Sequence, residues 1–304
     1  MGLPTPHFEK LVATLANEKL PDMDKPRIEQ AIDRYHQWIK SLDAAAKSAE
    51  NPVQELVRLL NEYRNFIDIE LVFDSPADFL YRQKGQLKLD NSVIEEFLPR
   101  LVHPRVLPEL NLADLHSGPA SCFSSAFFAS SLDSPVADGG LSFRTKDQDF
   151  AIAKKLFVKA SHDATFANAP TKFTYLAYVA AECKTNLDKT MFQEACATAN
   201  DVKSAVSGAR YYLLCEWLDM TPLSTAPTDI DEVIILRKAK RLSSNVRSKF
   251  GSAVGRQKHR DQYVGFLTKN PICQAMICRL VEHIRELMLN EAPIEDDVLK
   301  TGYF

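Results

Sequence analysis

The sequence lacks the features that mark membrane, secreted and zinc-binding proteins. No apolar run reaches the roughly 18 residues that a membrane span needs. The opening residues, MGLPTPHFEKL, do not have the basic-then-apolar layout of a signal peptide. The six cysteines form no CxxC pair, and their spacings fit no common zinc module. We therefore expect reduced cysteines in a cytoplasmic protein without a membrane partner.

The motifs of several enzyme classes are also missing. There is no GxxxxGK loop followed by Ser or Thr, which excludes the ATPases that bind phosphate in this way. There is no GxSxG nucleophile elbow and no HExxH zinc motif. The formal net charge of -3 does not by itself indicate a nucleic-acid binder. The distribution of basic residues therefore matters more than their total.

The first part of the chain is predicted to be helical. The composition, 45% hydrophobic and 25% charged over 304 residues, is typical of a globular protein. Residues 27–50 place apolar side chains at steps of three and four, and Asn51-Pro52 begins another helix. A further helix is predicted over residues 91–101. We expect residues 1–115 to form a helical region that serves DNA recognition or dimerisation.

The centre of the chain alternates between strand-like and helix-like segments. Residues 116–146, rich in Ser, Ala and Gly, are predicted to form an irregular connection. Residues 147–260 are predicted to form a core whose strands cover 150–161, 172–184, 210–218 and 231–238, with a helix over 190–208. This order favours an α/β (or α+β) fold, in which a mixed sheet is flanked by helices. The last region, 261–304, is predicted to hold one helix over 261–290 and a tail.

A group of three residue types points to metal-dependent chemistry. Glu182 and Lys184 lie two apart at the end of a predicted strand, so they share one face. Asp163 ends the preceding strand, and pairing of the two strands would bring both carboxylates together. Magnesium prefers one or two carboxylates with water and phosphate oxygens. We expect Asp163, Glu182 and the carbonyl of Cys183 to bind Mg²⁺, with Lys184 orienting water or stabilising the phosphate.

The helix that follows carries two further candidates. Thr190 and Gln193 have the spacing of a capping box, and Asp188 is an alternative cap. In either case Gln193 or Glu194 would face the metal site from the first turn. A second acid-x-Lys triplet, at residues 201–203, falls inside this helix, where residues two apart do not share a face.

Basic residues are concentrated downstream. Residues 236–260 contain nine Lys or Arg and no acid, although the chain as a whole is acidic. Such a stretch is typical of a surface that contacts phosphates. The residues we expect to contact DNA are Lys238, Lys240, Arg241, Asn245, Arg247, Lys249, Arg256, Lys258 and Arg260.

The motif and its surroundings resemble a known family. AECK at the end of a strand, with an acid upstream, is similar to the PD-(D/E)XK nuclease superfamily. The wider run YVAAECKTNLDKTMFQEACATANDVKSAVSGARYYLLCEWLDM, followed by TDIDEVIILRKAKR, resembles type II restriction endonucleases of the BbvCI group. The likeness covers about residues 80–260 and is strongest at 175–240. It implies a mixed-sheet nuclease core.

The resemblance implies an activity and partners. Such an enzyme cuts double-stranded DNA with Mg²⁺, for which Mn²⁺ can substitute, and leaves 5′-phosphates. Each subunit cuts one strand, so a homodimer, or a heterodimer with a related nuclease subunit, is implied in a bacterial cytoplasm. Glu182 and Lys184 match the second acid and the lysine of the motif, and Asp163 is matched to the first acid. No proline precedes Asp163, and Asp147 and Asp149 are the alternatives.

Two other functions share most of these features. One is a DNA-binding subunit that does not cut, whose acid-x-Lys site is structural. The other is a repair nuclease on the same core, although the chain has no helicase motif. Retention of all three residue types favours a cutting enzyme over the first, and the self-contained chain favours restriction over the second.

Overall fold

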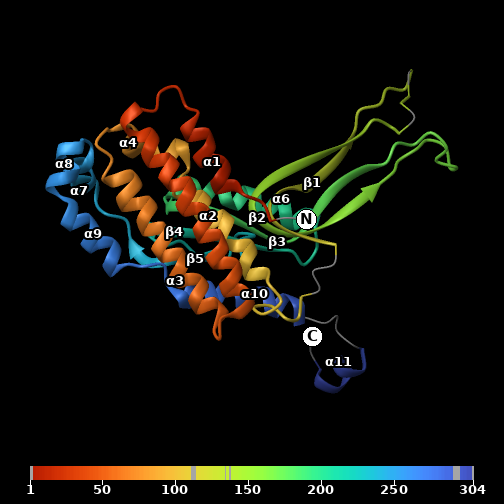
Figure 1. The fold of residues 1–304 in the computed structure, drawn as a ribbon. Coiled ribbons are helices and arrows are strands. Elements are labelled where there is room, and N and C mark those ends of the chain that lie inside the picture. The colour runs from red at the N-terminus through yellow and green to blue at the C-terminus, as the bar shows by residue number, and fades with distance from the viewer. Residues whose placement is uncertain (1–2, 111–113, 134, 137, 290–294, 303–304) are drawn as a thin grey trace.

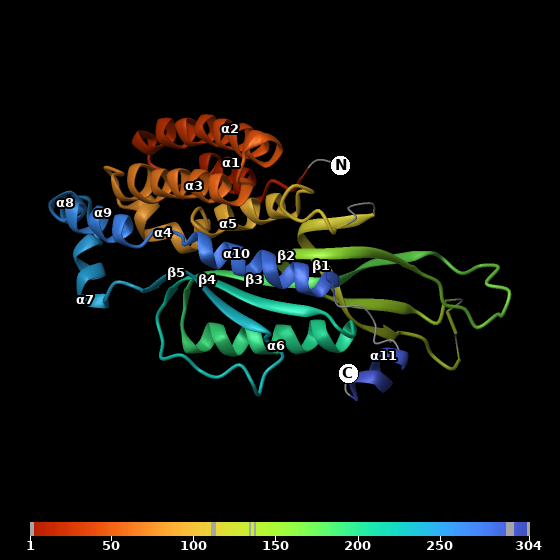
Figure 2. The same ribbon diagram turned by 90° about the horizontal axis from the view of Figure 1, so that it is seen from below.

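The chain folds into three layers around one mixed sheet. The computed structural model describes residues 3–110, 114–133, 135–136, 138–289 and 295–302. Helices from the first third of the chain cover one face of the sheet, and α6 (Lys189–Ala205) lies against the other face (Figure 1, Figure 2). Within the described residues, no helix combines the length and apolar character needed to cross a bilayer.

The first layer is helical, as the sequence predicts. Asn51 caps α3, because its side chain accepts a hydrogen bond from the backbone N–H of Gln54 at 3.2 Å. The chain then continues as a π-helix, η2, a rare conformation that is often found at functional sites. The elements are α1 (Pro6–Leu15), η1 (Asp22–Asp24), α2 (Lys25–Ser48), α3 (Pro52–Asn65), η2 (Phe66–Phe73), α4 (Phe79–Leu87), α5 (Asn91–Phe97) and η3 (Leu98–Val102).

The sheet has five strands in the order β1-β2-β3-β4-β5. The first three strands pair antiparallel and the last three pair parallel, which confirms the predicted mixed sheet. Helix α6 connects the parallel strands β3 and β4, as a parallel pair requires a crossover. The strands are β1 (Leu115–Phe128), β2 (Leu141–Val158), β3 (Lys172–Leu187), β4 (Arg210–Leu218) and β5 (Glu232–Lys240).

The prediction of an irregular connection over residues 116–146 is wrong. Most of this segment is β1 and the beginning of β2, which pair over their length. The small residues that suggested a loop have a packing role, because Cys122 is fully buried and Ala120 packs beside it in the core under α6. Strand formation here depends on its neighbours rather than on local propensity, which is weak for Ser and Ala.

The C-terminal segment contains several helices where the sequence predicts one. α9 ends at Lys269, and Pro271 separates it from α10 because proline disfavours a helical conformation at the residue before it. Asn270 accordingly has a φ of -129° and a ψ of 63°. The elements are α7 (Ser244–Arg247), η4 (Ser248–Phe250), α8 (Ala253–Lys258), α9 (Arg260–Lys269), α10 (Gln274–Leu289) and α11 (Glu295–Thr301).

A buried ion network joins the helical layer to the sheet. Arg64 of α3 hydrogen-bonds to Glu216 of β4 at 2.9 Å, and Arg237 of β5 hydrogen-bonds to the other oxygen of Glu216 at 2.7 Å. All three side chains are almost fully buried. Apolar residues of the helical layer and of one sheet face also form one continuous core. The helical region therefore packs as a layer of the core.

The end of β1, both ends of β2 and the beginning of β3 project beyond the layers as an arm (Figure 1, Figure 2). The arm exposes large aromatic side chains, with Phe128 63%, Phe157 62% and Phe173 54% accessible. The turn between β2 and β3 lies at its tip (Figure 2). The hairpin therefore has a core end between the layers and an exposed arm end.

Candidate active site

Glu182 and Lys184 lie side by side at the core end of β3. Because side chains alternate along a strand, both point to the same face, and Lys184 Nζ is 2.5 Å from Glu182 Oε1. Tyr211 of β4 donates a hydrogen bond from its hydroxyl to Glu182 Oε2 at 2.9 Å. Burial lowers the pKa of Lys184, but the hydrogen bond to Glu182 and its charge outweigh burial and raise it. Lys184 is therefore held as a cation.

Asp149 of β2 is the acid that lies next to this pair. The register places Phe150 opposite Ala181, so Asp149 comes opposite Glu182 across the strands. Its Oδ2 accepts a hydrogen bond from the backbone N–H of Cys183 at 2.8 Å. Burial and the nearby charge of Glu182 raise the pKa of Asp149 above its usual value. Asp149 was an alternative in the sequence, and the structure brings it to Glu182 and Lys184.

Asp163 lies at the other end of the hairpin. β2 and β3 do pair, but their last pair is Val158 with Lys172, and Asp163 follows in the exposed turn. Ten residues of β3 separate Lys172 from Glu182, which is about 33 Å along a strand. Hydrogen bonds from the side chain and backbone of Thr165 lower the pKa of Asp163. Asp163 and Glu182 therefore cannot share one metal ion, which corrects the expected pairing.

Glu95 of α5 is a further acid near the site that the sequence did not single out. It is buried, and its Oε1 accepts a hydrogen bond from Asn91 Nδ2 at 2.7 Å. Burial and the charge of Asp149 raise the pKa of Glu95 to about 7. In the sequence Glu95 looks like any acid on a helix, because its proximity to Asp149 arises only from packing of α5 on the sheet.

The first turn of α6 faces the site only in part. Asp188 is the cap, since its side chain accepts a hydrogen bond from the N–H of Met191 at 2.9 Å, whereas Thr190 lies within the helix. The charge of Glu194 makes a small contribution to raising the pKa of Lys184. Gln193 is exposed, and no described contact links it to the site.

The residues at this site fit a hard divalent cation. No group of three or more His, Cys, Asp or Glu side chains within the described ranges is arranged to hold a metal. Magnesium needs fewer side chains, because it keeps several waters and takes only one or two carboxylates. Burial and the charge of Glu182 raise the pKa of Asp149, and burial and the charge of Asp149 raise that of Glu95. A bound cation would relieve this repulsion between like charges. The thiol of Cys183 is buried, so this residue could contribute only its carbonyl.

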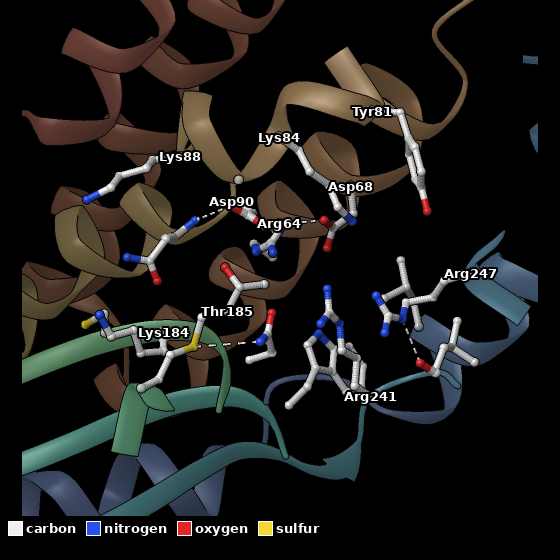
Figure 3. Close-up of a pocket in the computed structure, with 18 of the residues that line it drawn as sticks. Arg64, Asp68, Tyr81, Lys84, Lys88, Asp90, Lys184, Thr185, Arg241 and Arg247 are labelled. Atoms are coloured by element: carbon white, nitrogen blue, oxygen red, sulfur yellow. Dashed lines mark hydrogen bonds and ion pairs between the residues drawn. The ribbon is translucent and has the colours of Figure 1, made fainter. Parts of the chain in front are cut away.

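The site opens into a cavity of about 550 Å³, which we call the cleft. Asp149, Glu182 and Lys184 line one end of the cleft. Helix α4 runs along one wall, with Lys88 across the cleft from Lys184 and with Lys84 and Tyr81 farther along, as Figure 3 shows. Arg241 and Arg247 reach in from the facing wall, after β5 (Figure 3). The cleft therefore has basic side chains on both walls.

The basic stretch divides into exposed, cleft-lining and buried residues. Arg241 and Arg247 line the cleft, where Arg241 pairs with Asp219 at 2.9 Å. Arg260 is exposed but makes two hydrogen bonds of 2.8 Å to Asp74. The remaining exposed members are Lys238, Lys240, Asn245, Lys249 and Lys258.

Arg256 has a structural position that the sequence did not predict. Its side chain is buried, and its guanidinium donates hydrogen bonds to the carbonyls of Phe73, Ser75, Ala77 and Phe250. It also pairs with Asp78 at 3.2 Å. Arg256 therefore joins the basic stretch to the helical layer and is not available to contact DNA, which corrects that expectation.

Three cleft-lining cations on α4 and its end were missed in the sequence. They are Arg82, Lys84 and Lys88. The signal that could have found them is the segment RQKGQLK, which has three basic residues in seven and no acid. Its contribution becomes visible only once α4 is placed opposite the segment that follows β5.

Comparisons with known proteins point to one class of enzyme. A model of the Bpu10I restriction endonuclease family matches residues 86–304, which is well over half of the chain. No curated protein matches at a significant level. Among solved structures, a chain of the native BbvCI A2B2 tetramer at low resolution has a TM-score of 0.56 and 18% sequence identity. That similarity covers 95% of this chain and 98% of the other, and it shows a shared fold. The chain therefore belongs to the Bpu10I restriction endonuclease family, and the resemblance to type II restriction endonucleases is confirmed.

Proposed function

We propose that the chain is a magnesium-dependent, site-specific endonuclease that hydrolyses phosphodiester bonds of double-stranded DNA. The observation that carries the proposal is the grouping of Asp149, Glu182 and Lys184 at one end of a cleft with basic walls. Family membership supports the class of reaction. The site itself supports the choice of residues, because phosphate hydrolysis needs acids for a metal and a cation near the phosphate.

The residues at the site would divide the work as follows. Asp149, Glu182 and the carbonyl of Cys183 would hold Mg²⁺ (or Mn²⁺), and Glu95 would add negative charge behind them. Bound Mg²⁺ would neutralise charge on the transferring phosphate and lower the pKa of the attacking water. Lys184 would orient that water or stabilise the charged phosphate, since it is fixed as a cation beside Glu182. Hydrolysis would leave 5′-phosphates.

Two residues of α6 would have different roles. The charge of Glu194 would influence how strongly the amine of Lys184 is held. Gln193 is exposed and would act only if bound DNA comes into its reach.

DNA would lie along the cleft and contact both walls. The exposed and cleft-lining members of the basic stretch face the cations of α4, so duplex DNA would meet positive charge on both sides. The helical layer would thus contribute to DNA recognition through α4.

One site cuts one strand, so a complete enzyme would need two subunits. The solved relative is described as an A2B2 tetramer, which supports an assembly that contains related but different subunits. We infer that this chain acts as a homodimer or with a related nuclease subunit in the bacterial cytoplasm. A non-cutting role is the alternative, and the complete set of acid, acid and lysine argues against it.

The test is cleavage of supercoiled plasmid DNA with Mg²⁺, by the chain alone and with a related subunit. Discrete fragments support a site-specific enzyme, and nicks at discrete places support one active site in a mixed assembly. Glu182→Ala and Lys184→Ala should abolish cutting while DNA binding persists. Asp201→Ala is the matched control, because it alters the second acid-x-Lys triplet, where Asp201 pairs with Lys146 at 2.8 Å outside the cleft, and it should cut normally. Absence of cutting by the wild type under both conditions would show that the proposal is wrong.

A further inference from the structure

The cleft has two chemically different ends. Glu182 and Asn186 both line it, and the four residue steps of strand from one to the other span about 13 Å. Arg241 lies farther along, because its N–H bonds to the carbonyl of Leu218, which pairs with Leu187. Helix α4 runs the same way, with Lys88 at the same end of the cleft as Lys184 and Tyr81 at the far end (Figure 3). The far end therefore lies several nucleotides from the acids along a bound strand.

Aromatic rings line this far end, which we call the aromatic end. Tyr263 stacks on Phe73 with ring centres 4.2 Å apart, and Trp217 stacks on Phe266 at 4.7 Å. The partly exposed rings that line it are Tyr81, Tyr263 and Phe266, and the buried rings of Trp217 and Phe250 pack against Phe266 and Tyr263. Aromatic rings do not bind phosphates, which are bound by cations, whereas the apolar face of a base stacks on rings.

Two cations that form no ion pair within 4 Å in the described part of the chain, Lys84 and Arg247, lie at the same end. The amine of Lys84 lies over the ring of Tyr81, 4.9 Å from its centre. Burial lowers the pKa of Lys84, and the charges of Asp90 and Asp68 only partly offset this effect. Arg247 hydrogen-bonds only to the carbonyl of Leu242 among the described residues. Half-buried cations without partners are costly, so this end is suited to an anion such as a phosphate.

The floor of the aromatic end is polar. Arg64 and Asp68 line it, with their ion pair at 2.5 Å, and Asp68 comes from the π-helix η2. Burial raises the pKa of Asp68, so this carboxyl takes up a proton more readily than a free one. The carboxyl of Asp68 offers acceptors, and a donor when it is protonated, that can pair with the edge of a base, while Arg64 is held by its bonds to Asp68 and Glu216.

We propose that the aromatic end is a nucleotide-binding subsite that takes one base of the DNA out of the helical stack. The base lies against the rings with its edge toward Asp68, and a neighbouring phosphate lies between Lys84 and Arg247. This inference rests on the proposed cleavage of DNA and adds a means of reading sequence beyond the cut.

The test measures DNA binding by the uncutting Glu182→Ala variant, with the related subunit if cutting requires it. The cut site is first mapped by sequencing fragment ends, and a single mismatched pair is then moved through the bound duplex. A mismatch at the extruded position should tighten binding about tenfold, because the cost of unpairing has been removed. Adding Tyr81→Ala should abolish this gain while binding of the perfect duplex changes less than threefold.

The control variant is Arg58→Ala, which removes an exposed cation of α3 outside the cleft and should keep the mismatch gain. If no mismatch position tightens binding, or if Tyr81→Ala keeps the gain, the inference is overturned. Cleavage of the perfect duplex by the wild type is measured in parallel. Normal cleavage without a mismatch gain defeats this inference alone, whereas absence of cleavage and of binding defeats the proposed function and the inference with it.

Discussion

The β2–β3 hairpin carries an aspartate at each end, and the two have opposite environments. Asp149 lies at the core end, where it is half-buried beside Glu182 and accepts a hydrogen bond from the Cys183 N–H. Asp163 lies in the exposed turn of the arm, where its carboxylate accepts hydrogen bonds from the backbone N–H and the hydroxyl of Thr165. Burial raises the pKa of Asp149, and hydrogen bonds lower that of Asp163. The same residue type is thus poised for cation binding at one end and for holding a turn at the other.

The largest expected effect comes from exchanging each aspartate for asparagine. Asp149→Asn removes a carboxylate from the proposed metal site and should lower the rate of DNA cleavage by roughly 1,000-fold or more. Asp163→Asn should leave the rate within about twofold, because Asp163 lies far from Glu182 along the hairpin. Both are measured by plasmid cleavage at saturating Mg²⁺. If both variants lost the same fraction of the cleavage rate, the proposed difference in role between Asp149 and Asp163 would be wrong.

The placement of these two acids also shows what sequence can provide. The strands on both sides of the turn were predictable from their apolar and β-branched residues, as were α2, α3 and α6 from periodicity and caps. β1 was not, because its Ser- and Ala-rich segment becomes a strand only by pairing with β2 under α6. The break at Pro271 was available in the sequence and outweighs the apolar periodicity around it.

The proposed site was predictable where local rules apply. Glu182 and Lys184 share a face because alternation along a strand is a local property. Asp149 could not be separated from Asp163, because the choice depends on where the hairpin turns and in which register its strands pair. Glu95 could not be predicted from the sequence, because it lies in α5, far from Asp149 along the chain.

Burial separates identical charges in the basic stretch as it does in the hairpin. Arg256→Ala should lower the free energy of unfolding by about 3–5 kcal/mol, because it leaves Asp78 and several buried carbonyls without a partner. Lys258→Ala, two residues away and exposed, should change it by less than about 0.5 kcal/mol. Urea unfolding measures both. If the Arg256→Ala variant is as stable as the wild type but binds DNA more weakly, Arg256 contacts DNA and does not have the structural role proposed here.

The raised pKa values predict a pH dependence of metal binding. Glu95, with a pKa of about 7, is mostly protonated at pH 6 and ionised at pH 8, and a carboxyl must be deprotonated to attract a cation. The Mg²⁺ concentration for half-maximal cleavage should therefore fall roughly tenfold from pH 6 to pH 8. Glu95→Gln should flatten this dependence. Asp163→Asn should not, because a lowered pKa keeps Asp163 ionised over the whole range. A half-maximal concentration that stays constant with pH would contradict the coupling of Glu95 to the metal site.

The smallest expected effect is a change in the salt dependence of DNA binding, which tests which end of the hairpin contacts DNA. Binding at the cleft releases counterions from phosphates, so removal of one contacting lysine should reduce the slope of log affinity against log salt by about 1. Lys249→Ala, in the basic stretch, should have this effect. Lys155→Ala is the matched control, because this exposed lysine lies on the arm, 3.9 Å from the centre of the Phe173 ring. An unchanged slope for Lys155→Ala would leave the aromatic arm free to contact another protein subunit. A reduced slope would mean that the arm also holds DNA, and that both ends of the hairpin serve one substrate.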